Sequence, residues 1–197
     1  MRITKEKAEE NRVSLISAAG RLFRARGIDG VGVAEISKEA GLTHGALYAH
    51  FPSKDALAAA AMAEGVQRSY RRLHRHDRAD GTPDLSEFLD YYLSTEARDN
   101  LAGSCALAAS ASEVARQEAT VGAHFAEGYL NMATALEHQL AGQGMAADAA
   151  RRKALAITAA MLGGLTVARA TAKADPQLSD EVLAALRQVL SELGGGI

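Results

Sequence analysis

The amino-acid sequence predicts an all-α protein. Alanine-rich and leucine-rich runs such as ALAAAAMAEG and SCALAASASEVAR recur along the chain, and these residues lose little on entering a helix. Stretches of β-branched residues are scarce, and the 197 residues include only three prolines and no tryptophan. With 48% apolar residues, the chain can bury one substantial core, or it can join a small module to a larger one.

Three helices are predicted at the N-terminal end. Apolar residues recur at three- and four-residue spacing from about residue 9 to residue 26, where Gly27 ends the pattern. The segment VAEISKEA follows at 33–40, and Gly41 suits a left-handed position at its end. Thr43 can cap a third helix, HGALYAHF at 44–51. A long helix followed by two short ones and a tight turn predicts a helix-turn-helix, whose second helix lies in the major groove of DNA.

The remaining residues predict a larger helical body. Ser53 can cap a helix that runs from 54 to about 75, and the turn cluster DRADGTP follows it. Thr82 and Pro83 suit the start of the next helix, which carries apolar residues from Leu85 to Leu93. Further helices are expected at about 103–117, 120–141, 147–173 and 179–193, for a total of about nine. We therefore divide the chain into two domains, residues 1–53 and residues 54–197.

Charge is distributed unevenly along the chain. Residues 1–78 hold 14 Lys or Arg against 9 Asp or Glu, whereas residues 79–197 hold 8 against 15. This asymmetry predicts an N-terminal part that meets a polyanion. The single cysteine, Cys105, cannot form an internal disulfide, and the N-terminus lacks the apolar segment of a secretory signal. No uninterrupted apolar run approaches the roughly 20 residues that cross a bilayer, so we expect a cytoplasmic protein without a membrane partner.

The segment GLTHGALYAHFPSK, residues 41–54, has the composition of a recognition helix. Leu47 and Phe51 form an apolar underside that can fix the helix on its support. Small or hydrogen-bonding residues on the outer side are expected to approach base edges: His44, Gly45, Ala46 and Ala49. Residues at the rims are expected to bind backbone phosphates: Thr43, Tyr48, His50 and Lys54. The alternative is a helical hairpin within an ordinary bundle, against which the basic surroundings argue.

At these residues the sequence resembles the tetracycline-repressor (TetR) family of bacterial transcriptional regulators. The motifs LFRARG, VAEISKEAG, THGALYAHF and SK match the family pattern over roughly residues 9–57. The resemblance implies that Thr43, Tyr48, His50 and Lys54 anchor phosphates and that His44 and its small neighbours face bases. It also implies that residues 1–53 are the DNA-binding domain and residues 54–197 the effector-binding and dimerisation domain. Two heads of a homodimer would read a roughly palindromic operator in double-stranded DNA.

One position departs from the family pattern. Members carry Thr or Ser just before the second helix, where the hydroxyl caps that helix and touches phosphate, and here that position is Gly32. Glycine is an acceptable N-cap, so the fold is not affected, but one phosphate contact per head is lost. Arg2, Lys5 and Lys7 in the N-terminal arm can reach phosphate or the minor groove instead.

The last two helices are expected to form the dimer interface. Gly163 and Gly164 remove side chains from the middle of the helix at 147–173, where another helix would pass closely. The following helix carries more apolar surface than one small body needs, in Leu183, Leu186, Val189, Leu190 and Leu193. The resemblance places a four-helix bundle across a two-fold axis here. The alternative is that these helices close only the core of the monomer.

The resemblance also implies a pocket for a small effector between about residues 85 and 140. The residues proposed to line it are Phe88, Tyr92, Cys105, Phe125 and Tyr129, with Tyr91 and Met132 as further candidates. Aromatic residues at helical spacing are also what any bundle core contains, which is the alternative reading. A mostly apolar pocket would suit a hydrophobic or aromatic compound.

Cys105 has two interpretations. Because it lies near the predicted start of a helix, where a thiolate is favoured, it can be an oxidant or electrophile sensor. As a small residue among alanines, it can equally be a buried hydrophobe.

These observations predict a ligand-responsive, sequence-specific DNA-binding repressor without cofactor, metal or enzymatic activity. A small hydrophobic effector, or modification of Cys105, would release it from its operator. An enzyme with Cys105 as nucleophile and His124 or His138 as base is a second hypothesis, but no third orienting group is evident. A constitutive nucleoid or scaffold protein that lacks an effector is a third.

Overall fold

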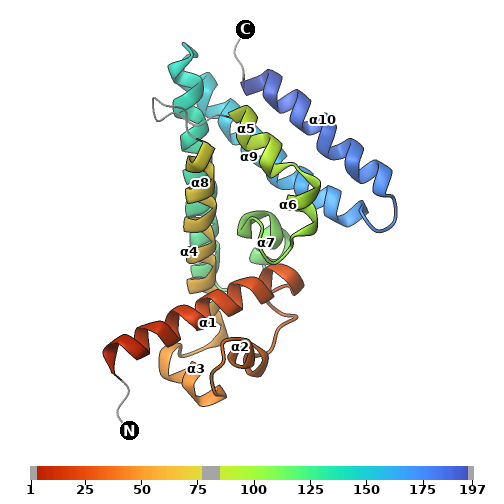
Figure 1. The fold of residues 1–197 in the computed structure, drawn as a ribbon. Helices are drawn as coiled ribbons and strands as arrows, with labels where there is room; N and C mark the ends of the chain where they lie inside the picture. The colour runs from red at the N-terminus through yellow and green to blue at the C-terminus, as the bar shows by residue number, and fades with distance from the viewer. Residues whose placement is uncertain (1–3, 77–84, 195–197) are drawn as a thin grey trace.

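The computed structural model describes residues 4–76 and 85–194, and within those ranges it contains ten α-helices and one short 3₁₀ helix. The helices are α1 (Lys5–Arg26), α2 (Val33–Glu39), α3 (His44–His50), α4 (Lys54–Leu73), η1 (His74–His76), α5 (Leu85–Tyr92), α6 (Thr95–Asp99), α7 (Ala106–Val114), α8 (Ala119–Gly142), α9 (Ala147–Thr171) and α10 (Pro176–Gly194). Figure 1 shows α1 to α3 as a head at one end, with the remaining helices forming a body above it. The predicted all-α fold is confirmed.

Side-chain caps set the starts of several helices. The Thr4 hydroxyl accepts from the Lys7 amide at 3.2 Å, so α1 begins at Lys5 rather than near residue 9. The Asp175 carboxylate accepts from the Leu178 amide at 3.0 Å, and α10 therefore begins three residues earlier than predicted. The predicted turn at 77–83, including the Thr82 and Pro83 cap, lies outside the described residues, as does Arg2.

The structure adds a short helix, α6, that the sequence analysis did not predict. Ser94 caps it by accepting from the Ala97 amide at 3.0 Å. Five residues are too few to display a helical period, so the pattern gave no signal. Arg98 fastens α6 to α10, because its guanidinium donates to the Ser179 hydroxyl at 2.9 Å and to the Asp180 carboxylate at 2.7 Å.

The head folds around a small apolar core. Leu15 of α1, Ile36 of α2 and Leu47 of α3 are all fully buried. Between α2 and α3 the Gly41 amide donates to the Lys38 carbonyl at 3.0 Å, and the Leu42 amide donates to the Ser37 carbonyl at 2.8 Å. These two bonds, with a φ of +70° at Gly41, form a Schellman turn that sets the direction of α3.

Two ion pairs hold α2 against α1. Arg21 and Glu39 lie 3.0 Å apart, and Arg26 pairs with Glu35. The hydrogen bond from Arg26 lowers the pKa of Glu35. Both pairs are solvent-exposed and therefore contribute little to stability, but they orient α2 relative to its neighbour.

The helix α4 connects the head to the body. It packs against α1 near the head and runs beside α8 through the body (Figure 1). Close approach of α4 and α8 depends on Gly128, because a Cβ atom there would lie 2.4 Å from a methyl group of Val66. Gly65 has a similar role on α4, where a Cβ atom would lie 2.7 Å from the Cβ of Ala106.

The helix α9 has the length and apolar composition of a membrane-spanning segment, although the sequence analysis expected no such run. Between Lys153 and Arg169 the helix carries no charged residue. In the structure it is packed against both α8 and α10, with Ile157, Met161 and Leu165 buried. Its apolar character therefore serves the core of the body.

Replacement of Gly128 by alanine tests the contact between α4 and α8. Gly128→Ala is expected to destabilise the protein by about 1–3 kcal/mol, because Val66 must move to admit the methyl group. Gly122→Ala on the same helix is the matched control, since the nearest atom lies 3.9 Å from its Cβ position. In this control the higher helix propensity of alanine should stabilise the protein by up to about 1 kcal/mol. Urea unfolding monitored by circular dichroism measures the stability of both variants. Equal changes in stability would contradict the close contact between α4 and α8.

Candidate functional site

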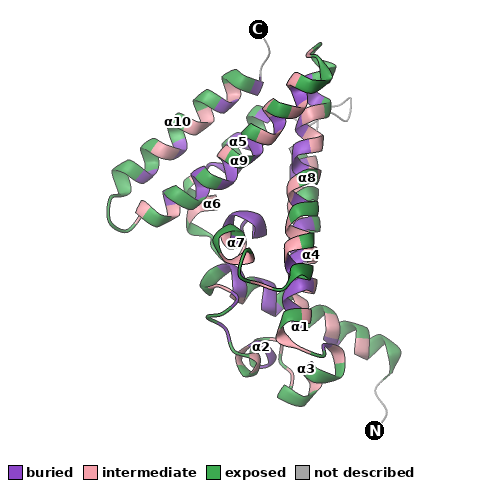
Figure 2. Ribbon diagram, turned by 180° about the vertical axis from the view of Figure 1, so that it is seen from behind, coloured by how far each residue is buried: buried purple, intermediate pink, exposed green. Residues whose placement is uncertain are grey.

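The helix α3 has a buried underside and an exposed outer face. Leu47 is fully buried and Phe51 is nearly so, with the Arg12 guanidinium 4.5 Å from the centre of the Phe51 ring. On the opposite side His44 and Gly45 are exposed, and no atom lies within 4 Å of the Cβ position at Gly45. Figure 2 shows that α3 lies at the end of the molecule remote from α10. The outer face is therefore small and open to a large ligand.

The residues expected at the rims surround this outer face. Tyr48 is 50% exposed, and its ring lies edge-on to that of His44 at 5.2 Å. His50 and Lys54 are half-buried at the junction of α3 and α4. The Thr43 hydroxyl caps α3 by accepting from the Ala46 amide at 3.3 Å. Ala46 is half-buried, so it is the least accessible of the residues expected to face bases.

The position of Gly32 agrees with its unusual identity. It is the N-cap of α2, makes no side-chain capping bond, and has no atom within 4 Å of its Cβ position. The space that a family Thr or Ser would occupy is therefore open. In the arm, Lys5 and Lys7 are exposed, and Lys7 pairs with Glu10 at 3.0 Å.

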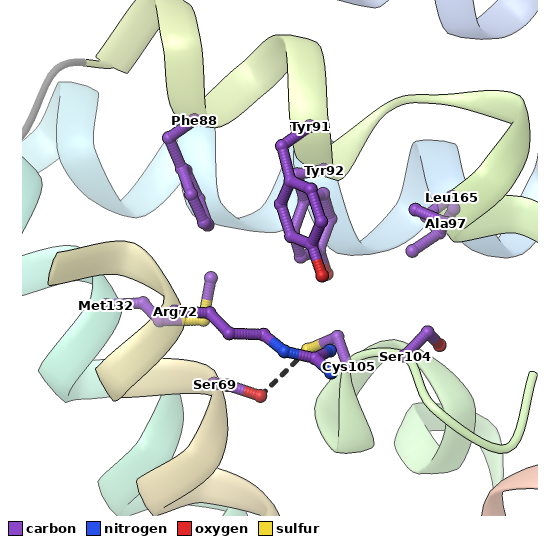
Figure 3. Close-up of a pocket in the computed structure, with 10 residues that line it drawn as sticks. All are labelled: Ser69, Arg72, Phe88, Tyr91, Tyr92, Ala97, Ser104, Cys105, Met132 and Leu165. Carbon is purple, nitrogen blue, oxygen red and sulfur yellow. Dashed lines mark hydrogen bonds between the residues drawn. The ribbon is translucent and has the colours of Figure 1, made fainter. Parts of the chain in front are cut away.

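A small cavity, partly open to solvent, lies in the body between α4, α5 and the start of α7. Its volume is about 20 Å³, the space of a water molecule. It is lined by Ser69, Arg72, Phe88, Tyr91, Tyr92, Ala97, Ser104, Cys105, Met132 and Leu165 (Figure 3). Three of the five residues expected to contact an effector thus meet here: Phe88, Tyr92 and Cys105.

The other two expected effector contacts lie elsewhere in the body. Tyr129 donates its hydroxyl hydrogen to the Leu155 carbonyl at 2.7 Å, and burial raises the pKa of this tyrosine. Phe125 is half-buried and packs against the edge of the core. Neither lines the cavity at Cys105.

Cys105 is the N-cap of α7 and is only 6% exposed. The Ser69 hydroxyl lies 3.7 Å from its sulfur (Figure 3). The side chains of Arg24, Arg68 and Arg169 interact electrostatically with the cysteine. The sequence analysis assigned no cation to this residue, because these arginines are distant along the chain.

Three guanidinium groups hold the segment that precedes Cys105. Arg24 of α1 donates to the Ala102 carbonyl at 2.7 Å, and Arg72 of α4 donates to the Gly103 carbonyl at 2.6 Å. Arg169 of α9 donates to the carbonyls of residues 97 and 98 at 2.9 and 3.1 Å, and also to the Ser104 hydroxyl. One short segment is thereby bonded to the head, to the connecting helix and to the C-terminal part of the body.

Arg24 is buried, which is unusual for a charged residue. It is 7% exposed, and burial together with the nearby Arg68 lowers its pKa to about 10. Its guanidinium fits because a Cβ atom at Gly20, four residues earlier, would lie 3.0 Å from Arg24 Nη1. The sequence carried one signal of this burial: Gly20 lies one helical turn before Arg24, on the apolar side of the same helix.

A second connection joins the body to the head. The Glu113 carboxylate near the end of α7 accepts from the Ile28 amide at 3.1 Å. A Cβ atom at Gly27 would lie 2.1 Å from the same carboxylate, so this contact requires glycine there. Gln117 reaches the Asp29 carboxylate at 3.3 Å. The short helix α7 thus begins at the cavity and ends against the head.

Comparisons with known proteins give consistent matches along the chain. Residues 15–61 match the family described as bacterial regulatory proteins, tetR family. Residues 84–179 match the C-terminal domain of LmrA/YxaF-like transcriptional regulators.

Individual proteins agree with these matches. The chain is 28% identical over 178 residues to the transcriptional regulator LmrA of Bacillus subtilis, an alignment that covers 86% of this chain and 92% of that protein. It is 38% identical over 91 residues to the probable regulator ArpR of Pseudomonas putida, covering 46% of this chain and only 40% of that protein. A crystal structure of a TetR transcriptional regulator from Legionella pneumophila shares the fold, with a TM-score of 0.77, 17% identity and 98% of both chains covered.

The buried hydroxyl of Tyr92 predicts a pH dependence of stability. Burial, with a further contribution from Cys105, raises the pKa of Tyr92 well above its usual value. An unfolded tyrosine loses its proton at a pH of about 10, whereas folded Tyr92 keeps it. The stability that this tyrosine contributes is therefore fully present below that pH, and above it stability falls by up to about 1.4 kcal/mol per pH unit until folded Tyr92 ionises.

Tyr92→Phe should remove this fall and leave the rest of the profile unchanged. Urea unfolding midpoints of both proteins, measured across the alkaline range, test the expectation. Identical slopes in the two proteins would show that the Tyr92 hydroxyl is solvated.

Proposed function

Because this chain belongs to the TetR family of bacterial transcriptional regulators, we propose that it is a sequence-specific repressor that a bound ligand releases from DNA. Members of this family are regulators and not enzymes. A soluble regulator of this kind acts on DNA in the cytoplasm.

The observation that carries the proposal is the arrangement of α3. Its apolar underside is buried in the head, while its small outer face is exposed at the end of the molecule. A helix with this division can enter the major groove of duplex DNA. His44 and Gly45 then face base edges, and Thr43, Tyr48, His50 and Lys54 hold the phosphates on either side.

A homodimer supplies two such heads. Large apolar residues remain exposed on α9 and α10, in Val167, Leu178, Val189 and Leu193. Gly163 is exposed, with no atom within 4 Å of its Cβ position, and so leaves room for a partner helix. Pairing of these faces across a two-fold axis would set the recognition helices roughly 34 Å apart, matching successive turns of a palindromic operator.

Control by a ligand follows from the contacts between cavity and head. A small effector that enlarges the cavity displaces the segment held by Arg24, Arg72 and Arg169, and moves α7 with it. Glu113 at the end of α7 carries the movement to Ile28 and the head. Release from DNA requires that the two head positions bind the effector with different affinity, typically by about 1–3 kcal/mol.

Modification of Cys105 is a second route to the same displacement. A group added to this sulfur would occupy the cavity that Tyr92 and Ser104 line. His124 and His138, considered above as bases, do not line that cavity. His124 instead lies 3.4 Å from the Glu127 carboxylate.

Selection of bound duplexes from a random pool tests the proposed function. The recovered sequences should share an inverted repeat. With that operator, His50→Ala and Tyr48→Phe should weaken binding to all duplexes by a similar factor of about 5 to 10, because they remove phosphate contacts. His44→Ala should instead change the preferred bases, and His138→Ala, an exposed histidine on α8, is the control without effect.

Two results would oppose this assignment. Salt-dependent binding with no preferred sequence would indicate the scaffold protein considered above. Equal losses on every duplex for all three head variants would contradict the division between base and phosphate contacts.

A further inference from the structure

Four arginine side chains gather around Cys105 from three different helices. Arg72 lines the cavity at Cys105, whereas Arg24, Arg68 and Arg169 do not line it but place positive charge near the cysteine. Figure 3 shows Arg72 among the side chains that line this cavity. These four residues are called the arginine cluster below.

The positive charge of the arginine cluster is balanced only in part, by the Glu64 carboxylate, which acts on Arg24 and Arg68. Among the described residues, Arg24, Arg72 and Arg169 form no ion pair with a carboxylate. Arg68 has Glu64 at 4.0 Å, and Glu64 lies closer to Arg71, at 3.5 Å. The region therefore holds an excess of positive charge in a poorly solvated place, which favours an anion.

Several donor atoms of this region also lack partners. Within the described part of the chain, Arg24 Nη2, Arg68 Nη2, Arg169 Nη1 and the Tyr92 hydroxyl are buried without a hydrogen bond. Arg24 and Tyr92 are themselves 7% and 5% exposed. Of these four residues only Tyr92 lines the cavity at Cys105. Buried polar atoms in folded proteins are nearly always paired, so the Tyr92 hydroxyl indicates a missing acceptor in this cavity. The raised pKa of Tyr92 keeps its hydroxyl protonated and able to donate.

Part of the lining of the cavity is apolar. Phe88 of α5, Met132 of α8 and Leu165 of α9 line it. A ligand that satisfies both parts of the lining carries a negative charge at one end and a hydrocarbon or aromatic body at the other. Because the cavity has only the volume of a water molecule, such a ligand must push the lining side chains apart to enter.

We propose that Arg72 and Tyr92, which both line the cavity, bind the carboxylate group of the effector, whose apolar body lies against Phe88, Met132 and Leu165. The other three arginines add positive charge around this site. The planar guanidinium presents paired donors that match the two oxygens of a carboxylate. The ligand class is therefore an aliphatic or aromatic carboxylic acid. This inference rests on the proposed function for its role in regulation, but the binding site itself stands on the geometry alone.

The position of Arg24 explains how such a ligand would act. Arg24 belongs to α1 of the head and already donates to the Ala102 carbonyl beside the cavity. Arg24 lines a neighbouring cavity and not this one. A carboxylate beside Arg72 therefore acts on Arg24 through residues 102–103, to whose carbonyls the two guanidinium groups donate.

Binding of simple carboxylates to the full chain tests the proposal. Formate and acetate probe the anion site alone, and benzoate and octanoate add an apolar body. The uncharged benzamide and octanamide are matched controls of the same shape, and inorganic phosphate tests for general anion binding. Thermal shift and isothermal titration calorimetry, performed without DNA, should show saturable binding of benzoate or octanoate that is at least about tenfold tighter than that of the matching amide.

Variants locate the site. Arg72→Gln should weaken carboxylate binding by about tenfold or more, whereas Arg71→Gln, one residue away with an exposed side chain, should leave it unchanged. Tyr92→Phe should also weaken binding severalfold while keeping or raising the melting temperature of the free protein, because the hydroxyl it removes has only the Cys105 sulfur, a weak acceptor, beside it. A purely structural arginine cluster would give the opposite result, with lower stability and no effect on carboxylate affinity.

The outcomes separate this inference from the proposed function. Specific DNA binding combined with no preference for any carboxylate over its amide, or with phosphate binding as tightly as benzoate, would overturn the carboxylate site alone. Carboxylate binding that is lost in Arg72→Gln supports the site, and release of operator DNA by the same carboxylate supports its regulatory role. Carboxylate binding without any DNA binding would support the carboxylate site and overturn the proposed repressor function.

Discussion

The structure depends on one short segment, residues 97–104, and on the three guanidinium groups that hold it. Arg24 comes from the head, Arg72 from the connecting helix and Arg169 from a C-terminal helix, and all three donate to backbone carbonyls of this segment. The segment ends at Cys105, where α7 and the cavity begin. Any change in the cavity must therefore alter bonds to the head, the connecting helix or the C-terminal part of the body.

The head was predictable because its determinants are local. The cap at Thr43, the Schellman turn at Gly41 and the inward pair Leu47 and Phe51 lie within one continuous stretch of sequence, and each has the predicted place in the structure. Most helices of the body were predicted for the same reason, since apolar period and capping residues act within a few positions. The helix α6 was missed because its five residues are too short to show a period.

The cavity at Cys105 and the arginines near it were only partly predictable, because they come from distant parts of the chain. Phe88, Tyr92 and Cys105 were named from the sequence, but no local pattern brings Arg24 and Arg169 to the same cysteine. The charge asymmetry of the chain was assigned wholly to a polyanion partner. In the structure Arg24 is buried and Arg72 lines the cavity, so part of that positive charge faces inward. Sequence position alone cannot separate arginines that meet solvent from those that meet the core.

Amide hydrogen exchange in Arg24→Met tests the central claim, that the segment at 97–104 joins body and head. This variant keeps the length and packing of the side chain but removes its bond to the Ala102 carbonyl. We expect faster exchange both at residues 101–106 and at the Ile28 amide, which Glu113 of α7 holds. If faster exchange is confined to α1, with residues 101–106 and Ile28 as protected as in the original protein, the segment does not couple the two parts.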